Sequence, residues 1–515
     1  MNPGKIIEFS LEMADHWHQL EENAMQAQIK VLRKLLRRAL KTQFGTHYNF
    51  GKILKSNNLV SSFQEAIPFH DYEKIYHDWW HRTLEGQRNV TWRGKTEYFA
   101  LSSGTSNATS KRIPISRMMF RMLRKSAFRL FTVLPSFHLP EDIYTKSWLA
   151  IGGTSRLDKI DGHFEGYLSG INARKRPFWA KAFYRPGDQI AQITDFDMRT
   201  DLIASQAADW DVGLIIGIPH WVQITLERIL KEHHVDQIKD IWPNLRGFIT
   251  GGVDYKPYEK TINKLVGRSL QYINTYLASE GMIALQDRPD SEDLRLVLDG
   301  GIFFEFIKTE DHNFDEDGNL VGNPMAYTID QVEKDQEYAI VISTCSGAWR
   351  YLLGDTIFFI DPAQGKIRIS GRTKYYINLC TEHLTGDNMT AAIGQAEEDL
   401  GIVITEFMIA PQRLGDYFVH HWYVGLEESA DPTKIKQTLD EKLKKLNDDY
   451  RSERGTALSI ELEVVPTNYF YEWQMEQSSA AGQSKIPRVI KGDVFASWIR
   501  FLQFRNPPEN SKTNH

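Results

Sequence analysis

The chain has 515 residues, of which 42% are hydrophobic and 25% are charged. This composition is typical of a soluble globular protein and excludes a disordered or fibrous one, and the length predicts a large domain with a smaller one. The formal net charge of -6 argues against nucleic acid as the main partner.

Cysteine content and apolar runs bear on the compartment. The two cysteines, Cys345 and Cys380, allow at most one bridge and have no metal-ligand spacing, which favours a reducing, cytoplasmic setting. The first residues lack an apolar stretch long enough for a signal peptide, and no run of about 18 apolar residues occurs. We therefore expect a cytoplasmic protein that does not insert into a membrane.

Helical periodicity begins near the start of the chain. Apolar residues between positions 11 and 42 recur at helical spacing, and the segment FGTHYNFG then ends the pattern, which predicts an amphipathic helix. Residues 193–233 alternate a helical stretch, an apolar run that ends at Pro219, and a second helical stretch. This alternation is typical of an α/β domain.

Strand-like segments follow in the second half of the chain. Residues 293–311, 336–347 and 354–372 are β-branched and aromatic runs interrupted by Gly, Pro and Asp. We predict strands there, late in the large domain.

The pattern changes after Arg372. Two strand-like segments precede a helix that begins at Asp431 and Pro432, and a strand-like segment follows at 458–465. We therefore predict an α/β fold with a large multi-sheet N-terminal domain, residues 1–378, and a small α+β C-terminal domain, residues 379–515.

A Ser/Thr-rich segment, ALSSGTSNATSKRIPIS at 100–116, has the composition of a phosphate cradle. Phosphate binding needs converging backbone N–H groups, hydroxyls and an ammonium group, and the stretch from Ser102 to Lys111 supplies all three. It lacks the glycine and lysine spacing of a P-loop. Taken alone, it is equally consistent with a solvated loop.

Four segments in chain order, SSGTSNATSK, TYLASEG, WRYLLGD and GQSKIPR, resemble the signature of the auxin-responsive acyl-acid amido synthetase family. This family is the hormone-conjugating branch of the adenylate-forming superfamily, which also contains acyl-CoA ligases. The resemblance covers most of the chain. It implies the superfamily's large N-terminal domain and a small mobile C-terminal domain, with a hinge near Thr373 to Cys380.

The resemblance implies ATP and Mg²⁺ as ligands of the site. Glu280 matches the acidic residue that holds Mg²⁺, and Lys485 matches the mobile lysine that reaches the α-phosphate during adenylation. Tyr276 would lie against adenine, Asp355 would accept the ribose hydroxyls, and Arg372 would lie near ribose or phosphate. The positions that match nucleotide-binding residues are Ser102, Ser103, Gly104, Thr105, Ser106, Lys111, Thr250, Gly251, Gly252, Tyr276, Ser279, Asp355 and Arg372.

Two positions depart from the family pattern. Ala108 stands where many members have glycine, and Leu352 stands where many have arginine. Alanine rarely adopts the positive φ that glycine allows, so the loop at Ala108 is expected to differ in conformation from that of glycine-containing members. The arginine contact of relatives is therefore either missing or supplied by Arg350.

The resemblance implies an enzyme that joins a carboxylic acid to ATP, releases pyrophosphate, and transfers the acyl group from acyl-AMP to an amine, most plausibly an amino acid. The aromatic content of 12% permits an aryl or indolic acid. An acyl-CoA ligase and a non-catalytic acid- or nucleotide-binding descendant are the alternatives. We assign no role to the scattered histidines at 70, 220, 420 and 421.

Overall fold

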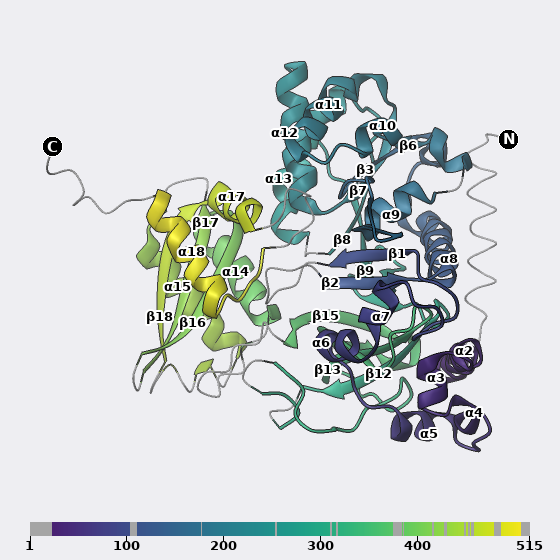
Figure 1. Cartoon of the computed structure of the whole chain (residues 1–515). Coiled ribbons are helices and arrows are strands. Elements are labelled where there is room, and N and C mark those ends of the chain that lie inside the picture. Colours follow the sequence, from purple (N-terminus) through teal and green to yellow (C-terminus); the bar gives the residue numbers. More distant parts are fainter. Residues whose placement is uncertain are drawn as a thin grey trace, which may run out of the picture.

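The computed structural model describes residues 23–102, 111–176, 178–252, 255–309, 312–315, 318–373, 384, 386–414, 417–426, 430–447, 450–451, 454, 458–477 and 486–505. These residues form an 11-stranded sheet, a 4-stranded sheet and a 3-stranded sheet with helices packed on them. The 3-stranded sheet and its helices lie beside the larger body in Figure 1. The predicted multi-sheet α/β class is confirmed.

The first described helix, α2, is the amphipathic helix that the sequence predicts. Asn23 caps it by accepting a hydrogen bond from the Met25 N–H at 2.9 Å, and leucines at 32, 35 and 36 are fully buried. Short helices follow it along the edge of the large sheet. Their bounds are α2 Ala24–Ala39, α3 Gln43–His47, α4 Phe50–Ile53, α5 Leu59–Ala66, α6 Tyr72–Ile75 and, after a π-helical turn at Tyr76–Trp80, α7 His81–Leu84.

One half of the 11-stranded sheet is parallel, in the order β9-β8-β7-β3-β6. The predicted helix, strand and helix of residues 193–233 are α11, β7 and α12. Helices α11 to α13 cover one face, and α8 packs on the other. The bounds are β3 Ser147–Ile151, β6 Tyr184–Arg185, α10 Asp188–Ala191, α11 Phe196–Gln206, β7 Val212–Gly217, α12 Pro219–His233, β8 Gly247–Gly251, α13 Lys256–Val266 and β9 Gln271–Ala278.

The other half of this sheet is antiparallel, in the order β12-β13-β14-β15-β11-β10. Its strands confirm the three strand-like segments of the sequence. The bounds are β10 Gly281–Gln286, β11 Leu294–Leu296, β12 Ile302–Lys308, β13 Glu337–Thr344, β14 Tyr351–Asp361 and β15 Lys366–Arg372.

The 4-stranded sheet has the order β2-β1-β5-β4, and its β1–β2 pair carries the Ser/Thr-rich segment. The bounds are β1 Tyr98–Ser102, β2 Lys111–Ile115, α8 Arg117–Val133, β4 Asp158–Ile160, β5 His163–Tyr167 and α9 Leu168–Arg174. Short 3-10 turns lie at Leu134–Phe137, Glu141–Thr145, Phe178–Ala182, Ala207–Asp209, Ile238–Asp240 and Pro362–Gln364.

The 3-stranded sheet, order β16-β17-β18, is the core of the C-terminal part. Asp431 caps α15 as the sequence predicts, and Ile435, Leu439 and Leu443 of that helix are buried. Two unpredicted helices, α17 and α18, cover the other face. The bounds are α14 Gly386–Leu400, β16 Ile404–Leu414, β17 Tyr417–Leu426, α15 Pro432–Leu446, β18 Leu458–Pro466, α17 Thr467–Gln477 and α18 Gly492–Arg505.

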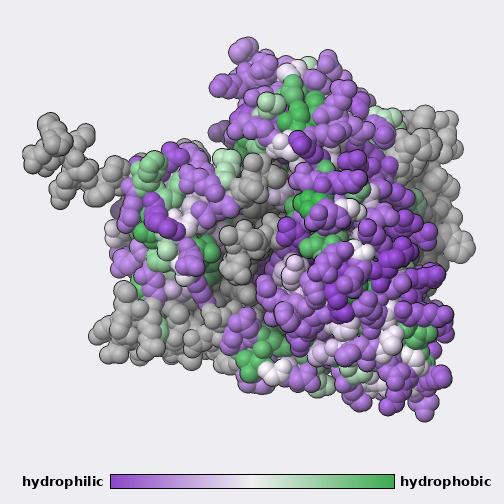
Figure 2. Space-filling model, in the orientation of Figure 1, coloured by the Kyte–Doolittle hydropathy of each residue, from purple (hydrophilic) through white to green (hydrophobic). Residues whose placement is uncertain are grey.

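Hydrophilic side chains prevail on the face that Figure 2 shows. Within the described ranges, no helix is both long and apolar enough to cross a bilayer. The proposed domain boundary at residues 378 and 379 and most of the proposed hinge lie outside the described residues, so both stay predictions.

Candidate active site

The two ends of the Ser/Thr-rich segment lie side by side. Ser102 is the last residue of β1 and pairs with Lys111, the first residue of β2. The Lys111 ammonium lies 5.4 Å from the centre of the Tyr72 ring, where a cation is stabilised by the aromatic face. The expected phosphate contacts of Ser103, Gly104, Thr105 and Ser106, and the departure at Ala108, lie outside the described residues.

Asp355 is held from two sides. It pairs with Arg372 across β14 and β15, and the Arg372 Nε donates to its Oδ1 at 2.7 Å. The hydroxyl of buried Tyr276 on β9 donates to its Oδ2. Burial, followed by the negative charge of Asp355, raises the pKa of Tyr276 and keeps it a donor. Three strands thus converge on the carboxylate that the family resemblance assigns to the ribose.

Glu280 lies close to this group, in the turn between β9 and β10. Its side chain is 7% exposed, and burial raises the pKa of its carboxyl, while the positive charges of Lys111 and Arg372 favour the ionised form. The Tyr351 hydroxyl hydrogen-bonds to it. Half-buried Ser279 precedes it in the same turn. A buried carboxylate next to cations can bind a divalent ion together with phosphate oxygens.

The end of β8 forms the neighbouring wall. Gly251 pairs with Thr275 of β9, and a Cβ there would lie 2.5 Å from the Thr275 carbonyl oxygen, so only glycine fits. Gly252 has a φ of 89°, which also favours glycine. The buried Thr250 hydroxyl lacks a hydrogen-bond partner in the described part of the chain. An unsatisfied hydroxyl at the carboxyl end of a parallel strand fits a polar ligand there.

The structure therefore brings together residues from strands β1, β2, β8, β9, β14 and β15 and from the turns that follow β8 and β9, namely Ser102, Lys111, Thr250, Gly251, Gly252, Tyr276, Ser279, Glu280, Asp355 and Arg372. Lys485 lies outside the described residues. Sequence reasoning missed Tyr72 and Tyr351. Tyr351 stands inside the WRYLLGD segment, but nothing in the sequence singles out Tyr72.

No cluster of three or more His, Cys, Asp or Glu side chains suited to a metal occurs among the described residues. Mg²⁺ often binds through one or two carboxylates and substrate phosphates, keeping waters for its other positions. Glu280 alone is therefore a sufficient protein ligand, so the residues present fit an ATP-bound Mg²⁺.

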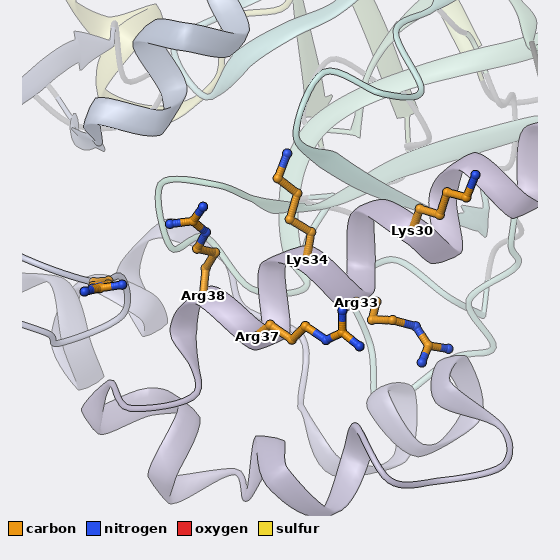
Figure 3. Close-up of a pocket in the computed structure, with 6 residues that line it drawn as sticks. Lys30, Arg33, Lys34, Arg37 and Arg38 are labelled. Atoms are coloured by element: carbon orange, nitrogen blue, oxygen red, sulfur yellow. The ribbon is translucent and has the colours of Figure 1, made fainter.

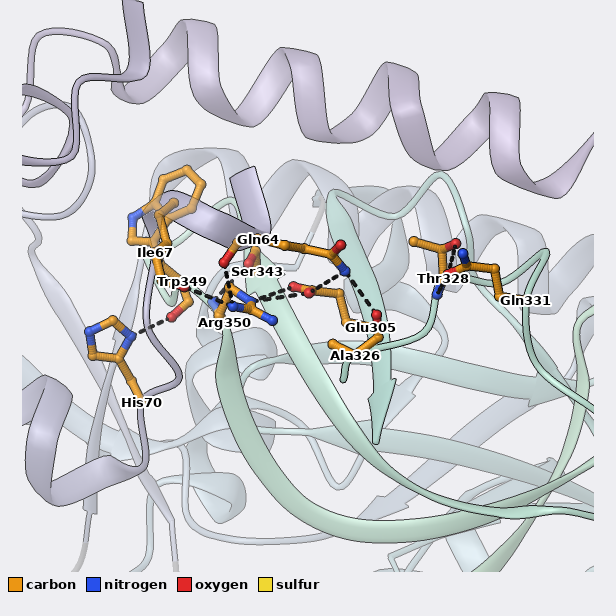
Figure 4. Close-up of polar contacts among 10 residues, drawn as sticks. All are labelled: Gln64, Ile67, His70, Glu305, Ala326, Thr328, Gln331, Ser343, Trp349 and Arg350. Atoms are coloured by element: carbon orange, nitrogen blue, oxygen red, sulfur yellow. Dashed lines mark hydrogen bonds and ion pairs between the residues drawn. The ribbon is translucent and has the colours of Figure 1, made fainter. Parts of the chain in front are cut away.

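Arg350 does not supply the missing cation. Its guanidinium is 3% exposed, donates to Glu305 at 3.1 Å, and also donates to the Gln64 and Ile67 carbonyl oxygens at 2.8 Å each (Figure 4). Of the two alternatives that the sequence left open, the structure favours a missing contact, because the Arg350 donors are used inside the core. Leu352 packs in an apolar cluster with Phe69 and has no polar role.

A second buried carboxylate joins the C-terminal part to the large sheet. Glu406 on β16 accepts hydrogen bonds from the Tyr258 hydroxyl on α13, from the Tyr471 hydroxyl on α17 at 3.1 Å, and from Arg488 at 2.8 Å. Arg488 belongs to the GQSKIPR segment. Figure 1 shows α13 next to α17 at this junction. No sequence pattern pointed to a role for these residues.

His220 on α12 lies beneath the same junction. Its ring stacks on Tyr471 with centroids 5.6 Å apart, and its Nε2 has no hydrogen-bond partner in the described part of the chain. Burial, with a smaller effect of Arg488, lowers the pKa of His220 to about 3. The histidine is therefore neutral while the two parts are docked.

The fold as a whole is similar to solved structures of adenylate-forming enzymes. A GH3.15 acyl acid amido synthetase superposes with a TM-score of 0.75 at 16% identity, over 98% of this chain and 96% of that one. A 2-hydroxyisobutyryl-CoA ligase in the postadenylation state superposes with a TM-score of 0.57 at 13% identity, over 93% and 92%. At these identities the likeness establishes the fold class.

Sequence comparison identifies the family. The chain matches the GH3 family N-terminal domain over residues 14–207, the central domain over residues 295–369 and the C-terminal domain over residues 387–493. The chain therefore belongs to the GH3 family, and the resemblance inferred from the four segments is confirmed.

Individual relatives are distant. The chain is 24% identical over 293 residues to the indole-3-acetic acid-amido synthetase GH3.17 of Arabidopsis thaliana, covering 49% of this chain and 48% of that protein. It is 31% identical over 127 residues to the jasmonoyl–L-amino acid synthetase JAR4 of Nicotiana attenuata, covering 23% and 20%. The chain thus spans about half the length of GH3.17 and less of JAR4.

Removing the charge of Arg350 should destabilise the large domain. Arg350→Met leaves Glu305 buried without its ion pair, and we expect a loss of about 3–5 kcal/mol in the free energy of unfolding by urea. The control is Arg368→Met on β15, whose partner is Asp293 and whose side chain is 54% exposed. It should lose less than about 1 kcal/mol. Equal losses would contradict the central role of the Glu305–Arg350 pair.

Docking of the C-terminal part should weaken as the pH falls. The docked form holds His220 with a pKa of about 3, whereas an exposed histidine titrates near about 6.5. The undocked form therefore binds the proton more tightly, and the docking constant should fall about tenfold per pH unit below about 6.5. Energy transfer between dyes on the two parts measures this.

The variant His220→Phe should remove the pH dependence while keeping the stacked ring. The control His77→Phe changes a histidine whose side chain is 90% exposed, and it should keep the wild-type dependence. If the docking constant of His220→Phe depends on pH as that of the wild type does, a group other than His220 controls docking.

Proposed function

We propose that this protein is an ATP-dependent acyl-acid amido synthetase. It adenylates a carboxylic acid, releases pyrophosphate, and transfers the acyl group to an amine, with an amino acid as the acceptor class. The observation that carries the proposal is the convergence, in a GH3 family chain, of Lys111, Asp355 and Arg372 from three strands with Glu280 from the turn between β9 and β10.

The first step brings two anions together. A carboxylate oxygen of the acid attacks the α-phosphorus of ATP, and the bond from that phosphorus to pyrophosphate breaks. Lys111 and the hydroxyls and N–H groups that begin at Ser102 bind the phosphates and offset their charge. Mg²⁺, when bound at Glu280, supplies further charge stabilisation to the phosphate oxygens.

Asp355 and Arg372 orient the nucleotide. The Asp355 carboxylate has four lone-pair positions, so it accepts ribose hydroxyls while it keeps its bond to Tyr276 or Arg372. Tyr276 fixes the carboxylate from the core side. Thr250, Gly251 and Gly252 line the base, where the Thr250 hydroxyl gains the partner it lacks within the described residues.

Lys485 completes the site in this proposal. It precedes Arg488 by three residues, and Arg488 is anchored to Glu406 at the junction with the large sheet. In this proposal, docking through Glu406 is the step that brings Lys485 to the nucleotide. Undocking then withdraws the lysine and admits the amine, which attacks the acyl carbon and expels AMP.

The acceptor and acid classes rest on relatives. The names of GH3.17 and JAR4 specify indole-3-acetic acid-amido and jasmonoyl–L-amino acid synthesis. We assign this chain a carboxylic acid, with an aryl or indolic body as the first class to assay, and an amino acid. A cytoplasmic location without membrane insertion is part of the same proposal.

Product analysis tests this function. We expect acid-dependent release of pyrophosphate from MgATP across a panel of carboxylic acids, and an amide when mixed amino acids are added. Mass spectrometry identifies the product. A thioester formed with added coenzyme A would establish the acyl-CoA ligase instead, and ATP binding without release by any acid would favour a non-catalytic descendant.

Lys485→Ala should slow pyrophosphate release about a hundredfold to a thousandfold, because one positive charge at the reacting phosphate is lost. The dissociation constant of MgATP should change far less, since the lysine acts chiefly in the transition state. Single-turnover release and equilibrium binding measure the two effects. Lys491→Ala, on the other side of Arg488, is the control and should leave the rate near that of the wild type.

A further inference from the structure

A row of cations follows the exposed side of α2. The helix has no acidic residue, and Lys30, Arg33, Lys34, Arg37 and Arg38 are all exposed. Figure 3 shows these side chains around a recess on the helix, and Arg93 completes its lining. Its volume is about 480 Å³, and each described residue that lines it is cationic.

The spacing of these cations is unfavourable for the helix itself. Lys30, Lys34 and Arg38 follow one another at intervals of four residues, as do Arg33 and Arg37. Like charges at this spacing destabilise a helix by about 0.2–0.5 kcal/mol per pair. The helix dipole favours cations only in the last turn, so it accounts for Arg37 and Arg38 but not for the earlier three.

A second recess continues the first. It shares Lys34, Arg38 and Arg93 with it, and its volume is about 410 Å³. The further cations of its lining are Arg88, Lys95, Arg117 and Arg121. We call the two recesses the basic groove.

The basic groove is electrostatically one-sided. Among the described residues that line it, ten are cations and a single one, Glu97, is a carboxylate, which Arg117 binds at 2.8 Å. The whole chain, in contrast, carries a net charge of -6. Arg117 stands in the first turn of α8, where the helix dipole disfavours a cation. The groove therefore concentrates positive charge although the chain as a whole is negative and although the dipole of α8 disfavours a cation at Arg117.

The basic groove is distinct from the ATP site. Thr96, Glu97, Ser116 and Arg117 lie at one end of the β1–β2 hairpin, whereas the candidate active site lies at the other. A strand rises about 3.3 Å per residue, so the five residues of β1 separate the two ends by about 17 Å.

We propose that the basic groove binds a compact polyphosphate anion, that is, a small molecule or head group with several clustered phosphates. Seven of its ten cations are arginines, whose planar guanidinium groups bind phosphate through two parallel N–H bonds. The recess volumes match those of small-ligand sites. The charged ends of the described residues that line the first recess are all positive, which favours an anionic ligand over a neutral one.

Inorganic tripolyphosphate is the first probe, measured by isothermal titration calorimetry on the full chain. The variant Lys34→Glu/Arg38→Glu changes two residues shared by both recesses, and we expect its affinity to be at least about tenfold weaker, since the net charge of the groove falls by four units. Added salt should weaken wild-type binding. The charge-preserving variant Lys34→Arg/Arg38→Lys should bind nearly as the wild type does.

Two controls separate binding at the groove from binding at the ATP site and from a general effect of surface charge. Lys231→Glu/Lys434→Glu makes the same charge change at exposed positions on α12 and α15, and it should bind normally. Lys111→Ala removes a cation of the ATP site and should leave the groove-dependent binding intact. The groove variant should retain acid-dependent pyrophosphate release, so failure of this inference is distinct from failure of the proposed function.

A lipid arm identifies the source of the phosphates. Co-sedimentation with phosphatidylcholine vesicles, with and without phosphatidylinositol bisphosphate, measures binding to a phosphorylated head group. This result is compared with the binding of free tripolyphosphate in the calorimetry. Binding to either probe that the groove variant loses supports the proposal. The proposal is overturned if neither probe binds, if Lys111→Ala abolishes all binding, if the control pair loses as much affinity, or if only duplex RNA binds.

Discussion

The buried ion pair of Glu305 and Arg350 is the contact on which the geometry of the large domain depends. Arg350 has a φ of 42°, a conformation that an arginine adopts only when its surroundings hold it. Glu305 also accepts from Gln64 at 3.0 Å, so both charges are satisfied by hydrogen bonds. The backbone N–H of His70 donates a hydrogen bond to the carbonyl oxygen of Arg350, and the N–H of Leu352 donates one to the carbonyl oxygen of His70. The chain segment after α5 is thereby fixed to β14 a few residues before Asp355.

Glu406 has a comparable position at the junction with the C-terminal part, but its partners differ. Two of its three donors are tyrosine hydroxyls, and the cation, Arg488, comes from the same part of the chain as the carboxylate. Separating the two parts therefore breaks the hydrogen bond from the neutral Tyr258 hydroxyl and leaves the Glu406–Arg488 ion pair intact. An ion pair across the junction would leave two buried charges unpaired on separation. The arrangement thus favours reversible docking over permanent closure.

Periodicity and turn residues predicted much of the fold, but they carry little information about distant pairing. The helix within residues 11–42, the α11-β7-α12 unit, strands β12 to β15 and the cap of α15 follow from local patterns. The bond between Tyr276 and Asp355 joins β9 to β14, which no local pattern specifies. The role of Arg350 stayed open at the level of sequence, because a sequence gives a residue's charge but not its burial. Helix α17 was missed because its polar and apolar residues lack a clear period, whereas the apolar residues of α18 do recur at helical spacing and were overlooked.

The two ends of the β1–β2 hairpin differ in their charge pattern. At the Ser102–Lys111 end, the positive charges of Lys111 and Arg372 lie close to the carboxyl groups of Glu280 and Asp355. At the other end, Glu97 is the single carboxylate among the described residues that line the basic groove. Clustered cations with few carboxylates nearby produce a stronger local positive potential than cations paired with carboxylates. The groove end of the hairpin therefore attracts a multivalent anion more strongly than the Ser102–Lys111 end does.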